Sequence, residues 1–445
     1  MRIIAEGNTR VSRLLGKQLL KDVEYRIMRY VLRTECEDGT LLLNVITGEM
    51  VLISADEAQL LDYLPAHQAN KLGALIEHYF LVPVDYDEYV TVKKIRKLMR
   101  RLFAPRGINH YVIFPTTHCN ARCFYCFESD YARLQMDEDT ANQLIKYMLE
   151  HKKEDVLKIS WFGGEPLVGL VRIRQICDAL RERKVKFTSR MTSNGYLFTE
   201  ELAEIAAKEW NLKNIQITLD GTETIYNKTK SYISVKDNPY DRVMRNIQFL
   251  MDQGVVVEVR LNLTKENVVD LRNLAYELAQ KFPDHSKMHV YVHVVFGNVG
   301  YEPIVQCDDE TLSLYQKQVE LSEYLEQLGL VKHNDKLPCI KYVNCMADDV
   351  GSRVVYPDGS LFKCETVNLE EKIGDIHSDT VNMAAFNLYQ DFTEKNACDK
   401  CPICPKCLLV KQCTGLEWYN KYTCEYQIKQ LKNDMKKRYW DCKKG

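Results

Sequence analysis

A regular alternation of strand-like and helical segments between residues 108 and about 300 constrains the fold of this chain most. Helical runs separate the strand-like runs along the sequence. Six β/α units in a row predict a parallel sheet in the form of a partial barrel. In such barrels the functional residues lie at the carboxyl ends of the strands. The predicted strands span residues 111–116, 156–162, 186–192, 214–219, 255–261 and 288–296.

Composition excludes several classes of protein. The chain has 445 residues, 46% hydrophobic and 27% charged, which is typical of globular proteins with two to four domains. No run of about 18 apolar residues predicts a membrane helix, and the charged N-terminal segment does not resemble a signal peptide. The net charge of −2 gives no reason to expect a nucleic-acid or membrane partner. We therefore expect a cytoplasmic protein.

The sixteen cysteines are unusual for such a chain. A reducing compartment argues against a disulfide framework, so their clustering suggests metal binding. Three lie together at 119–126, and ten lie between Cys339 and Cys442. The isolated Cys36, Cys177 and Cys307 are expected to be small buried side chains.

Cys119, Cys123 and Cys126 follow the first predicted strand in the sequence THCNARCFYCFE. Thiolates hold iron–sulfur cubanes, normally four to a cluster. Three thiolates on one loop would hold three irons and leave the fourth iron open to a small molecule. Zinc is the alternative, but zinc sites usually pair a Cys-x2-Cys with a second, distant pair.

This loop, with Tyr125 before its last cysteine, resembles the cluster loop of radical S-adenosylmethionine (SAM) enzymes. The segment Gly163-Gly164-Glu165-Pro166 after the second strand is similar to the GGEP motif of that family, which holds the amino group of SAM. Glycines allow a close approach of the backbone, and a carboxylate suits an ammonium group. A plain turn is the alternative interpretation of this motif.

Three further strand ends resemble motifs of the same family. Ser193-Asn194 follows the third strand and is similar to the element near the ribose and carboxylate of SAM. Asp220, followed by a glycine, ends the fourth strand as in the S-x-D-G element, and Leu261 lies where the family closes on adenine.

The loop after Asp220 departs from the family, which usually has a histidine and then an arginine there. This chain has Tyr226 and Lys230 in that neighbourhood. The resemblance implies that the cluster reductively cleaves SAM to a 5′-deoxyadenosyl radical, which takes a hydrogen atom from the substrate, while the protein orients the cofactor.

The cysteine-rich C-terminal region resembles a SPASM domain, which holds two auxiliary [4Fe–4S] clusters. The sequence VVYPDGSLFKCE is similar to its β-hairpin, with Asp358-Gly359 as the turn. By this resemblance the first auxiliary cluster would be held by Cys339, Cys345 and Cys364, and the second by Cys404, Cys407, Cys413 and Cys424.

Several alternatives stay open in this region. The family has a further cysteine where this chain has Glu417, so the fourth ligand of the first auxiliary cluster is Cys398, Cys401 or an open position. A second register, Cys398-x2-Cys401-x5-Cys407, also fits the spacing, and a zinc ribbon is the alternative for this stretch alone. Glu365 follows Cys364 where sulfatase-maturing relatives have an acidic base, which makes it a catalytic candidate beside the ordinary reading as an exposed glutamate.

The first hundred residues read as a small α+β unit. Strands are predicted at 28–35, after the Asp38-Gly39 turn, and at 50–54; Ser54 and Glu57 then form a capping box. The layout resembles the winged-helix-like recognition element that binds leader peptides of ribosomally made, modified peptides by strand addition. An ordinary accessory domain is the alternative. The basic run at 93–101 is either a solvated helix face or a surface for an acidic peptide or domain.

These resemblances predict a four-part chain. A leader-binding domain and linker helix span 1–104, a radical SAM barrel spans 105–307, a connecting helix spans 308–338, and a SPASM domain spans 339–445. The chain as a whole is similar to radical SAM–SPASM maturases of precursor peptides, reduced by a flavodoxin or ferredoxin. We rank thioether formation from cysteine first and carbon–carbon crosslinking second. A sulfatase-type maturase and, from a different class, a zinc-binding interaction module are the remaining alternatives.

Overall fold

The computed structural model describes residues 1–16, 23–65, 72–295, 309–331, 337, 339–343, 345–378, 380–388, 401–407 and 424–444. The chain forms two compact units. The first comprises the described residues of 1–104, 333–344 and 392–445, and the second those of 105–332 and 345–391. The cysteine-rich region is therefore divided between the two units. Across the ranges given above, no helix has the length and apolar character that a membrane span requires.

The second unit is built on a nine-stranded sheet with the order β12-β11-β10-β9-β8-β7-β13-β14-β15. Its first six strands in the chain are parallel neighbours, which confirms the predicted partial barrel. These strands are β7 (His110–Ile113), β8 (Val156–Trp161), β9 (Lys186–Ser193), β10 (Leu212–Leu219), β11 (Val256–Leu263) and β12 (Met288–Val294).

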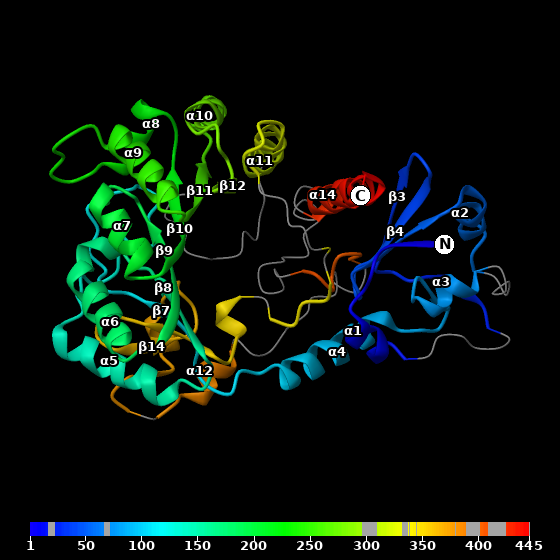
Figure 1. The fold of residues 1–445 in the computed structure, drawn as a ribbon, viewed down its shortest axis with the longest axis horizontal. Helices are drawn as coiled ribbons and strands as arrows, with labels where there is room; N and C mark the ends of the chain where they lie inside the picture. Colours follow the sequence, from blue (N-terminus) through cyan, green and yellow to red (C-terminus); the bar gives the residue numbers. More distant parts are fainter. Residues whose placement is uncertain are drawn as a thin grey trace. The chain divides into compact units, whose positions relative to one another are not determined.

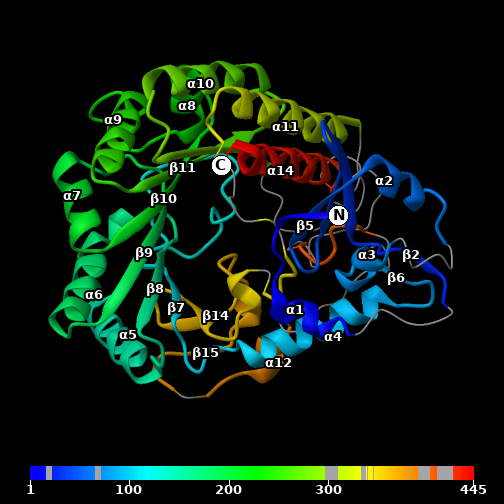
Figure 2. The ribbon, with the colours of Figure 1, turned by 45° about the vertical axis from the view of Figure 1, so that its right-hand side comes forward.

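A helix follows each of these strands, and Figure 2 shows the helices on the outer side of the curved sheet. The helix after β12 is α11 (Asp309–Gln327), which packs on β12 and is the last helix of the barrel rather than only a connection. The others are α5 (Glu138–His151), α6 (Leu170–Glu182), α7 (Glu200–Lys208), α8 (Glu223–Lys230), α9 (Pro239–Asp252) and α10 (Val268–Lys281).

The sequence of α5 shows why these helices form and pack as they do. The Asp137 side chain accepts a hydrogen bond from the Thr140 backbone N–H and caps the first turn. Apolar residues then recur at helical spacing, with Ala141, Leu144 and Met148 on the buried face. They join the main core between the helices and the sheet, which also contains Trp161 and Trp210.

The predicted hairpin around Asp358-Gly359 is present, but it belongs to the barrel unit. Strand β13 (Ser352–Val355) pairs in parallel with β7 and antiparallel with β14 (Ser360–Phe362), which in turn pairs with β15 (Gly374–Asp375). The hairpin buries a second apolar cluster with Phe114, which explains why it adds to the barrel sheet. Three short helices complete this region: η3 (Met346–Asp348), η4 (Leu369–Glu371) and α12 (Met383–Asn387).

The first unit contains a four-stranded antiparallel sheet with the order β1-β5-β4-β3 (Figure 1). The three predicted strands are β3 (Val31–Cys36), β4 (Gly39–Asn44) and β5 (Glu49–Ile53), and β1 (Arg2–Ala5) is an addition that the sequence did not reveal. The Ser54–Glu57 capping box is confirmed. The remaining elements are α1 (Thr9–Leu14), β2 (Tyr25–Ile27), α2 (Ala55–Leu61), α3 (Gly73–Glu77), β6 (Leu81–Pro83), α4 (Glu88–Leu102) and α14 (Glu425–Lys444).

Each face of this sheet is covered. Leu42 and Val51 pack with α2 and α3, while their neighbours Leu41 and Leu43 point to the opposite face. On that face α14 contributes Leu431, Met435 and Tyr439, at a spacing of four residues, together with apolar residues of α4. The C-terminal helix therefore completes the core of the N-terminal sheet.

Helix α4 also anchors the segment 401–407 through the buried side chain of Arg96. The guanidinium donates hydrogen bonds to the backbone carbonyls of Lys341 at 3.0 Å, Cys404 at 2.6 Å and Pro405 at 3.3 Å. Since buried carbonyls are costly to leave unpaired, this one side chain fixes the path of the cysteine-containing segment over the helix.

Arg96→Met should remove these three hydrogen bonds and destabilise the first unit by about 2–4 kcal/mol. Lys97→Met, at an exposed position of the same helix, should change stability by less than about 0.5 kcal/mol. Hydrogen–deuterium exchange would locate the effect. Faster exchange in 401–407 for Arg96→Met alone is expected, and equal exchange in both variants would contradict this role for Arg96.

Candidate active site

The cysteine loop begins at the carboxyl end of β7, where a ligand site of a parallel barrel is expected. Cys119, Cys123 and Cys126 are all partly buried and form no disulfide bonds. The Ala121 backbone N–H donates to the Cys119 sulfur at 3.4 Å. Burial, with Glu165 as the next contribution, raises the pKa of the Cys119 thiol to about 12. A bound cation at this thiol would oppose that effect and favour the thiolate.

The Gly163-Gly164 turn packs directly against the start of the cysteine loop. A Cβ atom on Gly164 would lie 2.4 Å from the His118 carbonyl oxygen, and one on Gly163 would lie 2.4 Å from that of Thr116. Gly163 also has a φ of +105°, which disfavours other residues. The Glu165 backbone N–H then donates to the His118 carbonyl at 2.9 Å. The two glycines thus bring the end of β8 against the loop.

Glu165 is fully buried and joins three strand ends. Its carboxylate accepts hydrogen bonds from the Ser193 hydroxyl at 2.9 Å, the Asn194 backbone N–H at 2.8 Å and the Leu167 backbone N–H at 3.2 Å. Burial raises the pKa of Glu165 to about 6, although these hydrogen bonds oppose the shift. A buried carboxylate without a close cation is suited to pair with a cationic ligand.

Asn194 connects this group to the cysteine loop. Its side-chain amide donates to the Asn120 side-chain oxygen at 2.7 Å and lies 4.0 Å from the Cys119 sulfur. The structure therefore brings Cys119, Glu165, Ser193 and Asn194 together at neighbouring strand ends, although they are separated by up to 75 positions.

A buried ion pair holds the other side of the loop. Lys230 lies 3.1 Å from the Asp220 carboxylate, and their side chains are 4% and 1% exposed. The Tyr125 hydroxyl donates to Asp220 at 2.6 Å and accepts from Lys230 at 3.1 Å. Burial lowers the pKa of Lys230, but Asp220 and Tyr125 outweigh this effect and raise it above its usual value. Lys230 is therefore a buried charged partner of both Asp220 and the loop residue Tyr125.

Two buried polar atoms beside the loop lack a hydrogen-bond partner among the described residues: the side-chain nitrogen of Asn120 and one carboxyl oxygen of Glu128. Neither residue was a candidate from the sequence, although Glu128 follows the last cysteine by two positions. Burial raises the pKa of Glu128 to about 8, so its carboxyl group is mainly protonated at neutral pH. Such unpaired buried atoms suit a ligand that supplies their hydrogen-bond partners.

The face of the barrel sheet opposite the helices carries polar side chains. Arg190 on β9 donates to the Ser160 hydroxyl, and Arg260 on β11 donates to the Asn262 side chain, each at 3.0 Å. Glu365 is partly buried near them; burial raises its pKa, and the two arginines oppose that shift. Sequence reasoning singled out Glu365 but missed both arginines, whose only signal was their place in alternating strands.

Two of the residues that the sequence predicted to bind the cofactor have side chains that are buried in the fold. Leu261 is fully buried in the main core, so its side chain faces the helices while Arg260 and Asn262 face the other way. A ligand there would meet the Leu261 backbone rather than its side chain. Pro166 is buried and begins the short helix η2 (Pro166–Gly169), where a missing N–H costs nothing.

The three cysteines of the loop lie near one another without forming a closed site for a single ion. Within the described ranges, no three His, Cys, Asp or Glu side chains are arranged to hold one metal ion. The loop cysteines still influence one another's pKa values, so they lie near each other. Three neighbouring cysteines on one loop are the kind of ligand set with which a cage binds a different iron at each sulfur.

The C-terminal cysteines fall in both units. Cys345 and Cys364 are in the barrel unit, whereas Cys339, Cys401, Cys404, Cys407 and Cys424 are in the first unit. Cys404 is buried in the core of that unit, with Cys401 and Cys424 packed against the same core. Cys398 and Cys413 lie outside the described residues, as does Cys307.

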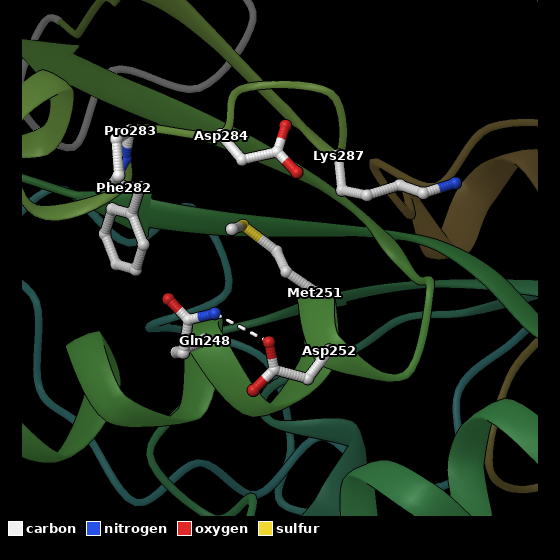
Figure 3. Close-up of a pocket in the computed structure, with 7 residues that line it drawn as sticks. All are labelled: Gln248, Met251, Asp252, Phe282, Pro283, Asp284 and Lys287. Atoms are coloured by element: carbon white, nitrogen blue, oxygen red, sulfur yellow. Dashed lines mark hydrogen bonds between the residues drawn. The ribbon is translucent and has the colours of Figure 1, made fainter.

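A pocket of about 250 Å³ lies elsewhere on the barrel (Figure 3). It is lined by the end of α9, including Met251, and by the turn before β12, including Phe282 and Asp284. These residues lie near the amino ends of β11 and β12, opposite the strand ends that bear the cysteine loop. The pocket is therefore separate from the candidate active site.

Comparison with known proteins agrees with this site. Residues 113–275 match the model of the radical SAM superfamily. The chain therefore contains a radical SAM domain, which indicates an enzyme and implies SAM and a [4Fe–4S] cluster as cofactors. An uncharacterised protein of Methanocaldococcus jannaschii is 24% identical over 279 residues, covering 61% of this chain and 90% of that protein. The GTP 3′,8-cyclase of Clostridium perfringens is 24% identical over 289 residues, covering 62% and 87%.

Two solved structures share the fold. The protein anSMEcpe, with bound AdoMet (SAM) and the Kp18Cys peptide, has a TM-score of 0.55 at 16% identity, covering 73% of this chain and 99% of that one. SuiB of Streptococcus suis, bound to the precursor peptide SuiA, has a TM-score of 0.50 at 15% identity, covering 88% and 98%. At these identities the likeness establishes the architecture.

Lys230→Met should destabilise the barrel unit by about 3–5 kcal/mol, because it leaves the buried Asp220 carboxylate without its cation. Lys230→Arg keeps the charge and should recover most of this loss. Urea unfolding of the metal-free protein, followed by the fluorescence of the buried Trp161 and Trp210, would measure both variants. Equal stability of Lys230→Met and the parent protein would exclude a structural ion pair.

Proposed function

We propose that this protein is a radical SAM maturase that forms thioether crosslinks from cysteine in a ribosomally made precursor peptide. The observation that supports radical SAM chemistry most directly is the convergence of Cys119, Glu165 and Asn194 at adjoining strand ends. A single-metal module gives no reason for the buried Glu165 or for the close packing of the two glycines against the loop.

In this proposal Cys119, Cys123 and Cys126 hold a [4Fe–4S] cluster, and Glu165 pairs with the amino group of SAM. Ser193 fixes the Glu165 carboxylate, and Asn194 lies between that carboxylate and the loop. Tyr125 is held by Asp220 and Lys230, so the loop keeps its position when the cluster is present. Once bound, the cluster and SAM would supply the 5′-deoxyadenosyl radical that takes a hydrogen atom from the peptide.

The polar sheet face beside the loop is the proposed peptide site. Arg190 and Arg260 would bind peptide carbonyl or carboxylate groups, and Glu365 would accept a proton from the attacking thiol. In the described part of the chain, neither arginine has an ion-pair partner within 4.0 Å. A close pair with Glu365 would neutralise one of them, so their separation from that carboxylate leaves both available to substrate.

A peptide substrate is supported by the relatives of known structure, two of which hold peptides. Strand β3 of the first unit pairs with β4 on one side and is an edge of its sheet. A leader peptide could add to that edge by main-chain hydrogen bonds. The likeness to SuiB over 88% of this chain favours a precursor peptide over a shorter substrate.

Two auxiliary clusters are part of the proposal. Bond closure after hydrogen abstraction releases a second electron, which an auxiliary cluster would accept. The proposed ligands of one cluster include Cys345 and Cys364 of the barrel unit. Those of the other are Cys404, Cys407 and Cys424 of the first unit, together with Cys413. Carbon–carbon crosslinking remains the second candidate, because it needs the same radical and the same electron acceptor.

The raised pKa of Glu165 predicts how SAM binding depends on pH. A cationic amino group requires the carboxylate, so protonation competes with binding as the pH falls through about 6. The dissociation constant should rise up to about tenfold per pH unit below about 6. Glu165→Gln should bind weakly and lose this dependence, whereas Glu150→Gln, an exposed control, should retain it. A parallel pH profile in Glu165→Gln would contradict the pairing.

Mass spectrometry tests the reaction itself. The reconstituted protein is incubated without oxygen with SAM, a reductant and the cysteine-containing peptide encoded beside its gene. Loss of two hydrogens per crosslink is expected, and Cys119→Ala should abolish it. Fragmentation and thiol alkylation then distinguish a thioether from a carbon–carbon link.

Other results would change the proposal in different ways. Formation of 5′-deoxyadenosine with an unchanged peptide mass would keep the radical chemistry and overturn the substrate. Absence of both products in protein that holds its clusters would overturn the enzyme proposal.

A further inference from the structure

Arg190 and Arg260 lie on the face of the barrel sheet opposite the helices, on β9 and β11, with β10 between them (Figure 2). Charged side chains in a sheet are stabilised by opposite charges directly across from them on neighbouring strands. Neither arginine has such a neighbour, because the four residues across from them are uncharged. These are Ser160 and Asn214 beside Arg190, and Thr218 and Tyr291 beside Arg260.

Both guanidiniums keep nitrogens available to a ligand. The Nε–H of Arg190 donates to the Ser160 hydroxyl, and that of Arg260 donates to the Asn262 side-chain oxygen, each at 3.0 Å. In the described part of the chain, the terminal nitrogens of the two side chains donate to no acceptor. Two parallel N–H bonds from a guanidinium match the two oxygens of a carboxylate. Each arginine can therefore still form its strongest kind of contact.

The two arginines act on one region of the sheet face. The Tyr291 hydroxyl donates to the Gln216 side-chain oxygen at 2.7 Å, so the Tyr291 side chain reaches from β12 to β10, between the strands that carry the arginines. Burial raises the pKa of Tyr291, and both guanidiniums oppose this shift. They also oppose the rise in the pKa of Glu365. Because charges act weakly at long range, the two guanidiniums lie around a common space.

Two carboxyl groups belong to the same region, but neither neutralises the arginines. Glu258 precedes Arg260 by two positions on the same face of β11, and Glu365 follows the β13–β14 hairpin. Among the described residues, no carboxylate oxygen lies within 4.0 Å of either guanidinium. A ligand with a carboxylate of its own would supply the pairing that the protein leaves open.

The depth of the arginines limits where that carboxylate lies. Arg190 is three residues before the carboxyl end of β9, where Ser193 binds Glu165. Arg260 is likewise three residues before the end of β11. At about 3.3 Å per residue, both backbones lie about 10 Å below the strand ends that bear the candidate active site. An extended peptide covers this distance with about three residues.

We infer that Arg190 and Arg260 bind a carboxylate of the precursor peptide and thereby select peptides with an acidic side chain near the crosslinked residue. This inference rests on the proposed function, because it requires a peptide on the polar sheet face. An unmodified peptide carries negative charge only as carboxylates, so two cations without a partner favour an aspartate or glutamate about two to four positions from the residue that loses hydrogen. The C-terminal carboxylate of the peptide has the same chemistry and is the other source.

The test uses the reconstituted full-length protein and the precursor peptide encoded beside its gene. Peptide variants replace each aspartate or glutamate of the modified segment by its amide, one at a time, and a further peptide has an amidated C-terminus. The protein variants are Arg190→Gln and Arg260→Gln. Arg174→Gln, at an exposed position of α6, is the matched control.

Mass spectrometry measures kcat/KM for crosslinking of each peptide. In the parent protein, one Asp→Asn or Glu→Gln replacement should lower it about tenfold or more. Arg190→Gln or Arg260→Gln should lower it about tenfold for the unchanged peptide but should no longer distinguish the acid from the amide. Arg174→Gln should behave as the parent does. Fully additive losses in enzyme and peptide would overturn the inference. A loss only with the amidated C-terminus would assign the arginines to that carboxylate and overturn the side-chain source.

A second readout separates this inference from the proposed function. Binding of SAM, measured by calorimetry, and its cleavage with dithionite in the absence of peptide should be equal in all four proteins. Weaker SAM binding in an arginine variant would assign that arginine to the cofactor and overturn the inference. Crosslinking of acidic and amide peptides at equal rates by the parent protein would overturn the inference alone. Cleavage of SAM without crosslinking of any peptide would overturn the proposed peptide substrate, and this inference with it.

Discussion

The candidate site depends on burial of a charged network against the cysteine loop. Asp220 directly follows β10, Lys230 ends α8, and the Tyr125 hydroxyl joins them from the loop. A charge pair at this depth is costly unless its hydrogen bonds are satisfied, so the three side chains constrain one another. A backbone hydrogen bond adds to this network, because the Arg122 backbone N–H donates to the Lys230 carbonyl at 2.9 Å. A loop that contains three thiols and little regular structure is thereby fixed to the barrel.

The sequence predicted the barrel closely because its signals are local and repeated. Buried parallel strands are short apolar runs, and caps such as Asp137 and Asn238 mark where the helices begin. The cysteine loop and the Glu165 turn could be located because barrel ligands collect at strand ends. The sequence could not predict which side chains contact one another at these strand ends, because a contact such as Asn194–Asn120 depends on how neighbouring strands align. Arg190 and Arg260 were missed for the same reason.

Local sequence patterns also could not predict that the cysteine-rich region is divided between the two units. Residues 345–378 look continuous with residues 401–444 in composition, yet the hairpin at β13 joins β7 while α14 covers the N-terminal sheet. The decisive contacts are long-range: Phe114 with Tyr356 in one unit, and Tyr439 with Asp38 in the other. The apolar spacing of Leu431, Met435 and Tyr439 is typical of a helix with one buried face, but it does not indicate which sheet that face covers.

Charged side chains have different surroundings at the candidate site and on the outer face of α4. At the candidate site the ionisable groups are buried and restrained: Glu165 by hydrogen bonds and Lys230 by Asp220. Side chains restrained in this way can orient a cofactor, and they need to move little during a reaction. On α4 the cations are exposed and unrestrained, which gives long-range attraction but little fixed geometry. A cofactor must stay in one orientation, so buried and restrained charge suits it.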